Sequence, residues 1–114
     1  MTQIETGTNE LLCEITRRVA IVTLNKPEKK NALGDILTPA LRALLPQLES
    51  RSDVGCVMIT GAGNAFCSGG DVSEMGGGGK ADVLALSPEE RISDLTEKQR
   101  ALTGRLYTLT KPTI

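Results

Sequence analysis

The stretch NAFCSGGDVSEM, residues 64–75, combines a cysteine, a serine, two adjacent glycines and an acidic residue in one connection. It follows VGCVMIT, residues 54–60, a nearly unbroken apolar run of strand length. Such a run is typical of a strand covered on both faces, as in a parallel sheet whose strands are joined by a helical crossover. The sequence therefore places a polar, glycine-rich loop directly after a predicted buried strand.

Two β-rich segments near the start of the chain are expected to pair as a hairpin. ELLCEIT and VAIVTLN together span residues 10–25 and carry the apolar residues expected of strands. Only Arg17 and Arg18 separate them, and arginine is not a favoured turn residue. The sequence thus predicts the hairpin without supplying a turn signal.

An amphipathic helix is expected next. The connection NKPEKKNALGD, residues 25–35, contains proline, glycine and charges, which is typical of a loop. The helix is predicted to open at Asp35 and to end at SRSD, residues 50–53, with Pro39 in its first turn, where backbone N–H groups have no helical partner. Its apolar positions recur at helical spacing: Leu37, Leu41, Leu44, Leu45 and Leu48. The order of elements is then β-β-α-β.

A second helix and a new strand are predicted at the end of the chain. Ser87 and Glu90 form an S-x-x-E capping box with proline at the first helical position, and a helix is expected over residues 88–109. Its apolar stripe is expected to pack against the core: Ile92, Leu95, Leu102, Leu106 and Leu109. KPTI, residues 111–114, has a proline followed by two β-branched residues, as at the start of a buried strand.

Composition limits the possible classes of function. The 114 residues suffice for one small domain, and 13 basic against 14 acidic residues give no basic face for nucleic acid or anionic membrane. Without a long apolar run or a secretory leader, the chain is expected to be soluble and cytoplasmic. Aromatic residues are limited to Phe66 and Tyr107, which leaves no platform for stacking bases.

The titratable residues further restrict the chemistry. Histidine is absent, so a mechanism confined to this chain must use carboxylates, lysines or the backbone. Cys13, Cys56 and Cys67 are odd in number and far apart, so they are expected to be reduced thiols rather than metal ligands or disulfides. No metal and no bound cofactor are therefore expected.

Three interpretations compete for residues 61–75. GAGNAF resembles a nucleotide-binding G-x-G-x-x-G, but Phe66 replaces the third glycine and no long helix opens there. Alternatively, the glycines only turn the chain, while Asp71 and Glu74 cap a short helix. In the third interpretation, Gly69 and Gly70 let a ligand approach backbone N–H groups, which could stabilise an enolate or a tetrahedral oxyanion.

Taken together, VAIVTLNKPEKKNAL, DVGCVMITGAGNAFCSGGDVSEM and KPTI, in this order and at these separations, resemble the N-terminal part of the crotonase family, the enoyl-CoA hydratase/isomerase superfamily. The resemblance covers nearly the whole chain from about Leu11, and AFCSGGD is its most specific part. It implies an α/β fold of repeated β-β-α units that form a spiral, of which this chain is the N-terminal part. It also implies that the glycine-rich loop binds an acyl-CoA thioester, with coenzyme A entering as part of the substrate.

The resemblance implies roles for individual residues. Gly70 takes the position of the first oxyanion donor through its backbone N–H. Ser68 lies where a backbone carbonyl meets the adenine end of CoA, Ala65 and Gly69 line the same bend, and Ala32 belongs to the other CoA-side segment. Asp71 closes the motif and is expected at the CoA-binding side while it keeps its capping role.

Other residues of these loops are expected to have lesser roles. Lys26, Lys29 and Lys30 are predicted to be solvated loop lysines, with contacts to CoA phosphates as the alternative. Cys67 and Phe66 are interpreted as packing residues. Glu74, Glu89 and Glu90 are interpreted as caps and helix-surface charges, with contact of Glu74 to the acyl chain as the alternative. The glycine run at residues 76–79 is predicted to be either a lid or a plain linker.

The resemblance also implies that the site is incomplete in these residues. In the family, the second oxyanion donor and the catalytic carboxylates follow the KPTI strand. The expected organisation is a polar tail, residues 1–9, and an apparently truncated acyl-CoA-binding segment, residues 10–114. Completed by further sequence or a second chain, it would hydrate or isomerise an enoyl-CoA and assemble as a trimer or hexamer. The alternative is an inactive fragment that only binds CoA or acts as an assembly partner.

Overall fold

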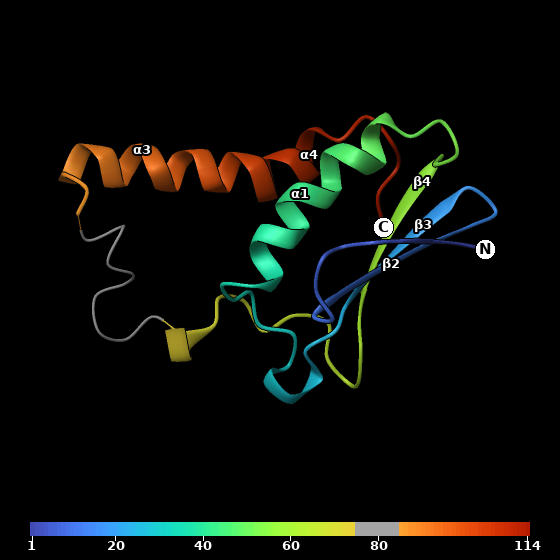
Figure 1. Cartoon of the computed structure of the whole chain (residues 1–114), viewed down its shortest axis with the longest axis horizontal. Coiled ribbons are helices and arrows are strands. Elements are labelled where there is room, and N and C mark those ends of the chain that lie inside the picture. Colours follow the sequence, from blue (N-terminus) through green and yellow to red (C-terminus); the bar gives the residue numbers. More distant parts are fainter. Residues whose placement is uncertain (75–84) are drawn as a thin grey trace.

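The computed structural model describes residues 1–74 and 85–114 (Figure 1). Four strands form one sheet in the order β1-β2-β3-β4, and α1 lies across one face of it. The strands are β1 Thr2–Ile4, β2 Leu11–Thr16, β3 Val19–Leu24 and β4 Cys56–Gly61. The helices are η1 Pro27–Lys29, α1 Leu37–Ser50, η2 Val72–Glu74, α3 Pro88–Gln99, the π-helical η3 Arg100–Gly104 and α4 Arg105–Thr108.

The predicted hairpin is confirmed. Strands β2 and β3 pair antiparallel from Leu11↔Leu24 to Thr16↔Val19. Arg17 and Arg18 form the turn with positive φ angles of 50° and 68°, the left-handed values that a two-residue hairpin turn requires. The Arg18 carbonyl accepts hydrogen bonds from the N–H groups of Gly55 and Cys56, which helps to hold this unfavourable backbone in place.

The predicted β-β-α-β order is also confirmed. Strand β4 pairs parallel with β3, from Val19↔Cys56 to Leu24↔Gly61, after the crossover through α1. Helix α1 begins two residues after the predicted Asp35 and ends at Ser50, as expected. Residues 112–114 then add a parallel segment on the far side of β4, where the N–H of Val57 donates to the Pro112 carbonyl at 2.9 Å. The predicted strand start at residues 111–114 is therefore present.

The expected polar tail contains a strand. Residues Thr2–Ile4 form β1, which pairs antiparallel with β2 in the register Thr2↔Ile15 to Ile4↔Cys13. Ile4 packs against the core at the sheet edge. A short polar segment lacks a strong strand pattern, but pairing with β2 satisfies its backbone groups and buries one apolar side chain.

The core lies between one face of the sheet and α1. Its buried side chains alternate along the strands and meet the leucine stripe of the helix: Leu11, Cys13, Ile15, Ala20, Val22, Leu24, Val57, Leu37, Leu41, Leu44, Leu45 and Leu48. The prediction that β4 is covered on both faces is wrong for the described residues. Leu12 and Met58, on the opposite face, are 45% and 37% exposed. One helix can cover only one face of this sheet.

The predicted helix over residues 88–109 forms as the consecutive segments α3, η3 and α4. Ser87 and Glu90 make the predicted capping box, with the Glu90 N–H donating to Ser87 Oγ. Leu102 is buried, but Ile92 and Leu95 on α3 are 68% and 58% exposed, so the predicted packing is wrong for the first half of the stripe. In Figure 1, α3 extends away from the sheet, which leaves its apolar positions uncovered.

The C-terminal part of this helix is attached to α1 by polar contacts. Arg105 Nη1 lies 3.2 Å from Glu49 Oε2, and Lys111 Nζ donates to the carbonyl oxygens of Leu48 and Arg51 at the end of α1. Arg42 Nε on α1 also donates to the Lys98 carbonyl at 3.0 Å, so the contact with α1 reaches the last turn of α3. Among the described residues, no helix has the length and apolar character needed to cross a membrane.

Candidate functional site

The glycine-rich loop and the loop after β3 meet at one edge of the sheet. Because β3 and β4 are adjacent and parallel, their carboxyl ends deliver residues 25–36 and 62–71 to the same place. The two loops pair directly through a parallel bridge between Leu33 and Gly70. The Leu33 N–H donates to the Gly69 carbonyl at 2.7 Å, and the Asp71 N–H donates to the Leu33 carbonyl at 3.0 Å.

This bridge fixes the direction of the Gly70 backbone. In a parallel bridge, Leu33 bonds to the residues on either side of Gly70, so the N–H of Gly70 itself points away from the partner segment. Within the described part of the chain, no hydrogen bond from this N–H is formed, and Gly70 is exposed. The geometry therefore leaves one backbone donor open at the end of the sheet.

Asn31 holds the two loops together from the inside. Its side chain is fully buried, and Oδ1 accepts a hydrogen bond from the Lys26 N–H at 2.8 Å. Nδ2 donates to the carbonyl oxygens of Ala62 and Ala65 at 3.0 and 2.9 Å. Asn31 has a φ of 57°, a left-handed value that asparagine tolerates better than most residues. One side chain thus satisfies three backbone groups of two loops.

Two glycines are required by this arrangement for different reasons. A Cβ on Gly61, at the end of β4, would lie 2.3 Å from the Ala65 carbonyl oxygen and 2.4 Å from that of Phe66. The absence of a side chain therefore allows the loop to fold back onto its own strand. Gly69 has space around it but a φ of 99°, which side-chain-bearing residues rarely adopt.

A buried charged cluster lies immediately beside Gly70. Lys26 Nζ is 3.3 Å from Asp71 Oδ2 and 3.4 Å from Glu10 Oε1, and the Lys26 and Asp71 side chains are only 9% and 4% exposed. Asp71 Oδ1 also accepts hydrogen bonds from the N–H and the hydroxyl of Ser73. Asp71 therefore caps η2, the predicted short helix, and joins both loops to the start of β2.

The cluster sets the ionisation of its members. Hydrogen bonds from Ser73, with the Lys26 and Lys29 ammonium groups nearby, lower the pKa of Asp71 to about 2, although burial acts in the opposite direction. Burial acts to lower the pKa of Lys26, but the hydrogen bonds to Asp71 and Glu10 outweigh it, so that this pKa is raised. Both groups are charged at neutral pH.

The predicted site residues come together at this edge, but with different exposure. Ser68 and Gly69 are exposed beside Gly70, whereas Asp71 is buried. The Ser68 N–H donates to the Lys30 carbonyl at 3.1 Å, which adds a further bond between the two loops. Ala65 is half-buried, and its carbonyl oxygen is taken up by Asn31. Ala32 is 5% exposed, so its methyl group belongs to the interior.

Some expectations for the loop side chains are corrected. Lys26 is not a solvated lysine, because it is buried against Asp71. Lys29 is exposed but donates to Ser73 Oγ at 2.8 Å. Phe66 is 59% exposed and is not a packing residue in this chain, whereas half-buried Cys67 packs against the core, as predicted. The predictions for the Glu74 side chain and for residues 76–79 fall outside what the structure describes.

Sequence reasoning missed the contacts of Asn31 and Glu10, and it assigned Gly61 only to turning the chain. Sequence reasoning placed Asn31 only within a family segment, although asparagine adopts left-handed backbone more readily than most residues and is common in turns. Glu10 and Lys26 lie far from Asp71 in sequence, so no local pattern could reveal their contact. Among the described residues, no group of three or more Cys, Asp or Glu side chains is arranged to hold a metal ion.

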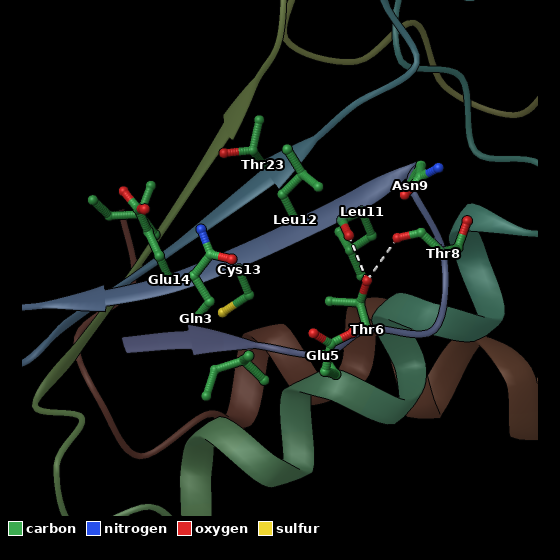
Figure 2. A pocket seen from close by; sticks show the side chains of 12 residues that line it. Gln3, Glu5, Thr6, Thr8, Asn9, Leu11, Leu12, Cys13, Glu14 and Thr23 are labelled. Atoms are coloured by element: carbon green, nitrogen blue, oxygen red, sulfur yellow. Dashed lines mark hydrogen bonds between the residues drawn. The ribbon is translucent and has the colours of Figure 1, made fainter. Parts of the chain in front are cut away.

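A separate groove of about 420 Å³ lies along β1 and β2, at the edge of the sheet that β1 forms (Figure 2). It is lined by residues of β1, β2, β3 and the connection between β1 and β2, including Gln3, Leu12 and Thr23. None of its lining residues comes from the loops at residues 25–36 and 62–71. The candidate site is therefore defined by the paired loops and not by this groove.

Comparison with known proteins supports one family. A family model described as enoyl-CoA hydratase/isomerase matches residues 19–114. A Mycobacterium tuberculosis protein named probable enoyl-CoA hydratase echA14 is 41% identical over 68 residues, which are 60% of this chain and 27% of that protein. An Escherichia coli protein named 1,2-epoxyphenylacetyl-CoA isomerase is 32% identical over 106 residues, covering 91% of this chain and 38% of that protein.

Solved structures agree with the sequence relatives. A Pseudomonas aeruginosa structure is 33% identical and has a TM-score of 0.72. The match covers 96% of this chain and 44% of that one. An enoyl-CoA hydratase/isomerase from Xanthobacter autotrophicus is 31% identical, with a TM-score of 0.72. That match covers 92% of this chain and 37% of the other. The chain thus spans between about a quarter and somewhat under half of the length of these proteins. It has the α/β fold of the crotonase family and belongs to the enoyl-CoA hydratase/isomerase family.

Proposed function

We propose that this chain binds an acyl-CoA thioester at its paired loops and supplies the first half of an oxyanion hole. The observation that carries the proposal is the direction of the Gly70 N–H, which points away from Leu33, at a residue that is itself exposed. A thioester oxygen placed on this donor would gain negative charge as the enolate forms. One such donor is worth about 3 kcal/mol of transition-state stabilisation in a water-poor site.

The surrounding backbone supports a role in holding the CoA part of the ligand. We expect the Ser68 carbonyl to meet the adenine end of CoA, since Ser68 and Gly69 are both exposed beside Gly70. The Ala32 side chain is buried, and the Ala65 carbonyl oxygen accepts a hydrogen bond from Asn31. We therefore expect both residues to shape the bend and not to bind CoA through their side chains. Asp71 is buried, and we expect it to support the loop through its contacts with Lys26 and Ser73 and not to touch CoA.

The described residues offer no general base beside Gly70. Asp71 is buried in an ion pair, and its pKa of about 2 makes it a poor proton acceptor at neutral pH. The proton transfer and the second oxyanion donor are therefore assigned to a further segment or a second polypeptide. Hydration of an enoyl-CoA and a double-bond shift both fit, and the cytoplasmic location and trimeric or hexameric assembly stay predictions.

Binding without catalysis is the second candidate function. It is favoured by the exposure of Leu12 and Met58 on the open face of the sheet, which suits a chain that must associate with another segment. The intact mass of every polypeptide in a purified sample, measured together with its turnover of an enoyl-CoA, separates the two. A species of 12.1 kDa alone that turns over no enoyl-CoA would leave only binding, whereas a longer chain or a second species with turnover supports the enzyme.

The site itself can be tested by titration of the ¹⁵N-labelled chain with acetoacetyl-CoA, CoA and ADP. We expect the thioester to shift the amide resonances of Ser68, Gly69 and Gly70, and to bind more tightly than CoA. Substitution Gly70→Pro removes the N–H and should abolish this difference, while Gly104→Ala, in the remote helix, should not. Equal affinity for thioester and CoA in the unaltered chain, or an unchanged preference in Gly70→Pro, would contradict the assignment.

A further inference from the structure

The Lys26 ammonium connects three segments that are distant in sequence. It lies 3.3 Å from Asp71 Oδ2, directly after Gly70, and 3.4 Å from Glu10 Oε1, directly before β2. Lys26 itself follows β3, and its side chain is 9% exposed. A buried ammonium is stable only when paired, so its contacts with the two carboxylates are retained rather than exchanged with water.

The position of this ammonium is fixed by its own backbone. The Lys26 N–H donates to Asn31 Oδ1 at 2.8 Å, and the Lys26 carbonyl accepts from the Asn31 N–H at 2.9 Å. The preceding residue, Asn25, donates its N–H to the Glu10 carbonyl at 2.8 Å. Lys26 therefore projects from a short loop that is closed on itself and attached to the sheet.

The Gly69–Gly70 segment has no side-chain anchor, and its contact with the other loop is the backbone bond from the Leu33 N–H to the Gly69 carbonyl. Neither residue has a side chain, and adjacent glycines have more backbone freedom than any other pair. The direction of the Gly70 N–H thus depends on the residues on both sides. On the C-terminal side this is Asp71, whose N–H bonds to Leu33 while its carboxylate bonds to Lys26.

Two further observations single out Lys26 among the lysines of this loop. Lys29 Nζ is 3.6 Å from Asp71 Oδ2, but its side chain is 45% exposed, so water and salt screen that contact. Glu10 Oε2 is buried and has no hydrogen-bond partner among the described residues, so the Glu10 carboxylate depends on Lys26 for its compensation. Without Lys26, two carboxylates would face each other beneath the loop.

We propose that Lys26 is a positioning residue that fixes the direction of the Gly70 N–H by anchoring Asp71 to the end of β3 and the start of β2. The role as a donor to the thioester rests on the proposed function, whereas the anchoring does not. Lys26 does not touch the ligand. It acts through Asp71 on the peptide that carries the donor.

Hydrogen exchange on the full chain tests the anchoring directly. The reporters are the amides of Leu33 and Asp71, which form the bridge, and the reference is the amide of Val57, which bonds to Pro112 in the sheet. In Lys26→Met, which keeps the length of the side chain and removes its charge, we expect the reporters to exchange at least tenfold faster relative to the reference. In the control, Lys29→Met, the change should stay below threefold.

Two outcomes would overturn the anchoring. One is unchanged protection of both reporters in Lys26→Met. The other is an equal loss at Leu33, Asp71 and Val57, which would mean that Lys26 contributes only to global stability. If Lys26→Met does not fold, Asp71→Asn serves instead, because it keeps the shape and removes the anionic partner. It should accelerate the reporters at least fivefold relative to Val57, and no such acceleration would refute the proposal.

A titration separates this inference from the proposed function. If acetoacetyl-CoA shifts the Gly70 amide of the unaltered chain, we expect at least a tenfold weaker preference for the thioester over CoA in Lys26→Met. An unchanged preference would refute the positioning role in binding. If acetoacetyl-CoA shifts no amide in the loop while the exchange result holds, the proposed function fails and the anchoring stands.

Discussion

The side-chain nitrogen of Asn31 lies 2.9 Å from the carbonyl oxygen of Ala65, so that one buried amide joins the loop after β3 to the loop after β4. The same side chain also bonds to Ala62 and to the Lys26 N–H. This contact places the candidate site at the end of two parallel strands. It is also the contact whose loss we expect to cost most stability outside the apolar core.

Substitution Asn31→Ala should lower the free energy of unfolding by about 3 kcal/mol, because it leaves three backbone groups without partners and places alanine at a left-handed φ. Urea unfolding measures the loss. The control, Asn64→Ala, alters an exposed asparagine of the second loop and should change stability by no more than about 0.5 kcal/mol. Equal effects would show that the three bonds contribute nothing specific.

Substitution Gly61→Ala should destabilise the chain by about 2–3 kcal/mol, because the new methyl group overlaps the backbone oxygens of Ala65 and Phe66. In Gly104→Ala the added carbon would meet Gln99 O at 3.5 Å, an ordinary contact, and removal of a helical glycine should stabilise by about 0.5–1 kcal/mol. Thermal unfolding of the pair gives the comparison. A tolerated Gly61→Ala would mean that the loop does not fold back onto β4.

Substitution Leu102→Ala should cost about 3 kcal/mol, since it opens a cavity in the core. Substitution Leu95→Ala, seven residues earlier on the same helical segment, should change stability by at most about 0.5 kcal/mol, because that side chain is 58% exposed. The urea unfolding midpoints of the two variants measure these two losses of stability. A large cost for Leu95→Ala would indicate that α3 packs against the fold in solution.

The Cys13 thiol should resist alkylation. Burial raises its pKa to about 11, with a smaller opposing effect of Arg51, so that little thiolate forms at pH 8. Mass spectrometry after iodoacetamide treatment should show modification of partly buried Cys56 and Cys67 well before Cys13. In urea all three should react at similar rates. Early modification of Cys13 in the folded chain would contradict its placement in the core.

Asp71 should make stability depend on pH in the acid range. Its carboxyl has an ordinary pKa of 3.8 and a folded pKa of about 2, so that the unfolded state binds the proton first. The stabilisation is complete above pH 3.8 and is lost as the pH falls through about 2. Urea midpoints at pH 5 and pH 2.5 should therefore differ more for the unaltered chain than for Asp71→Asn. The control, Glu28→Gln, should retain the full difference.

The elements of the fold were predicted where a local pattern determines them. The leucine spacing of α1, the apolar run of β4 and the Ser87 capping box each describe contacts within a short segment or a single buried face. The hairpin was predicted without its turn, because Arg17 and Arg18 adopt left-handed angles that the sheet and the turn before β4 stabilise from outside. Strand β1 was missed since its sequence has only one apolar side chain that packs on the core.

The site was predicted less completely, because its contacts are long-range. The motif of residues 64–75 indicated Gly70, but the open direction of its N–H follows from the bridge to Leu33. Lys26 looks like a surface lysine in a run of charges, and only its contacts with Glu10 and Asp71 explain its burial. For α3, too, the local pattern was not enough. Its apolar stripe indicates that the helix packs against something, but the spacing does not show whether the partner lies within residues 1–114.

The burial of Lys26 also has a consequence for its reactivity as an amine. Lysine is acylated through its neutral form, and Lys26 is held as an ammonium between two carboxylates, with a raised pKa. Lys30, four residues later in the same loop, is exposed to solvent. A reactive thioester near this loop would therefore modify Lys30 before Lys26. The ion pair with Asp71 and Glu10 would therefore also protect Lys26 from acylation by a reactive thioester.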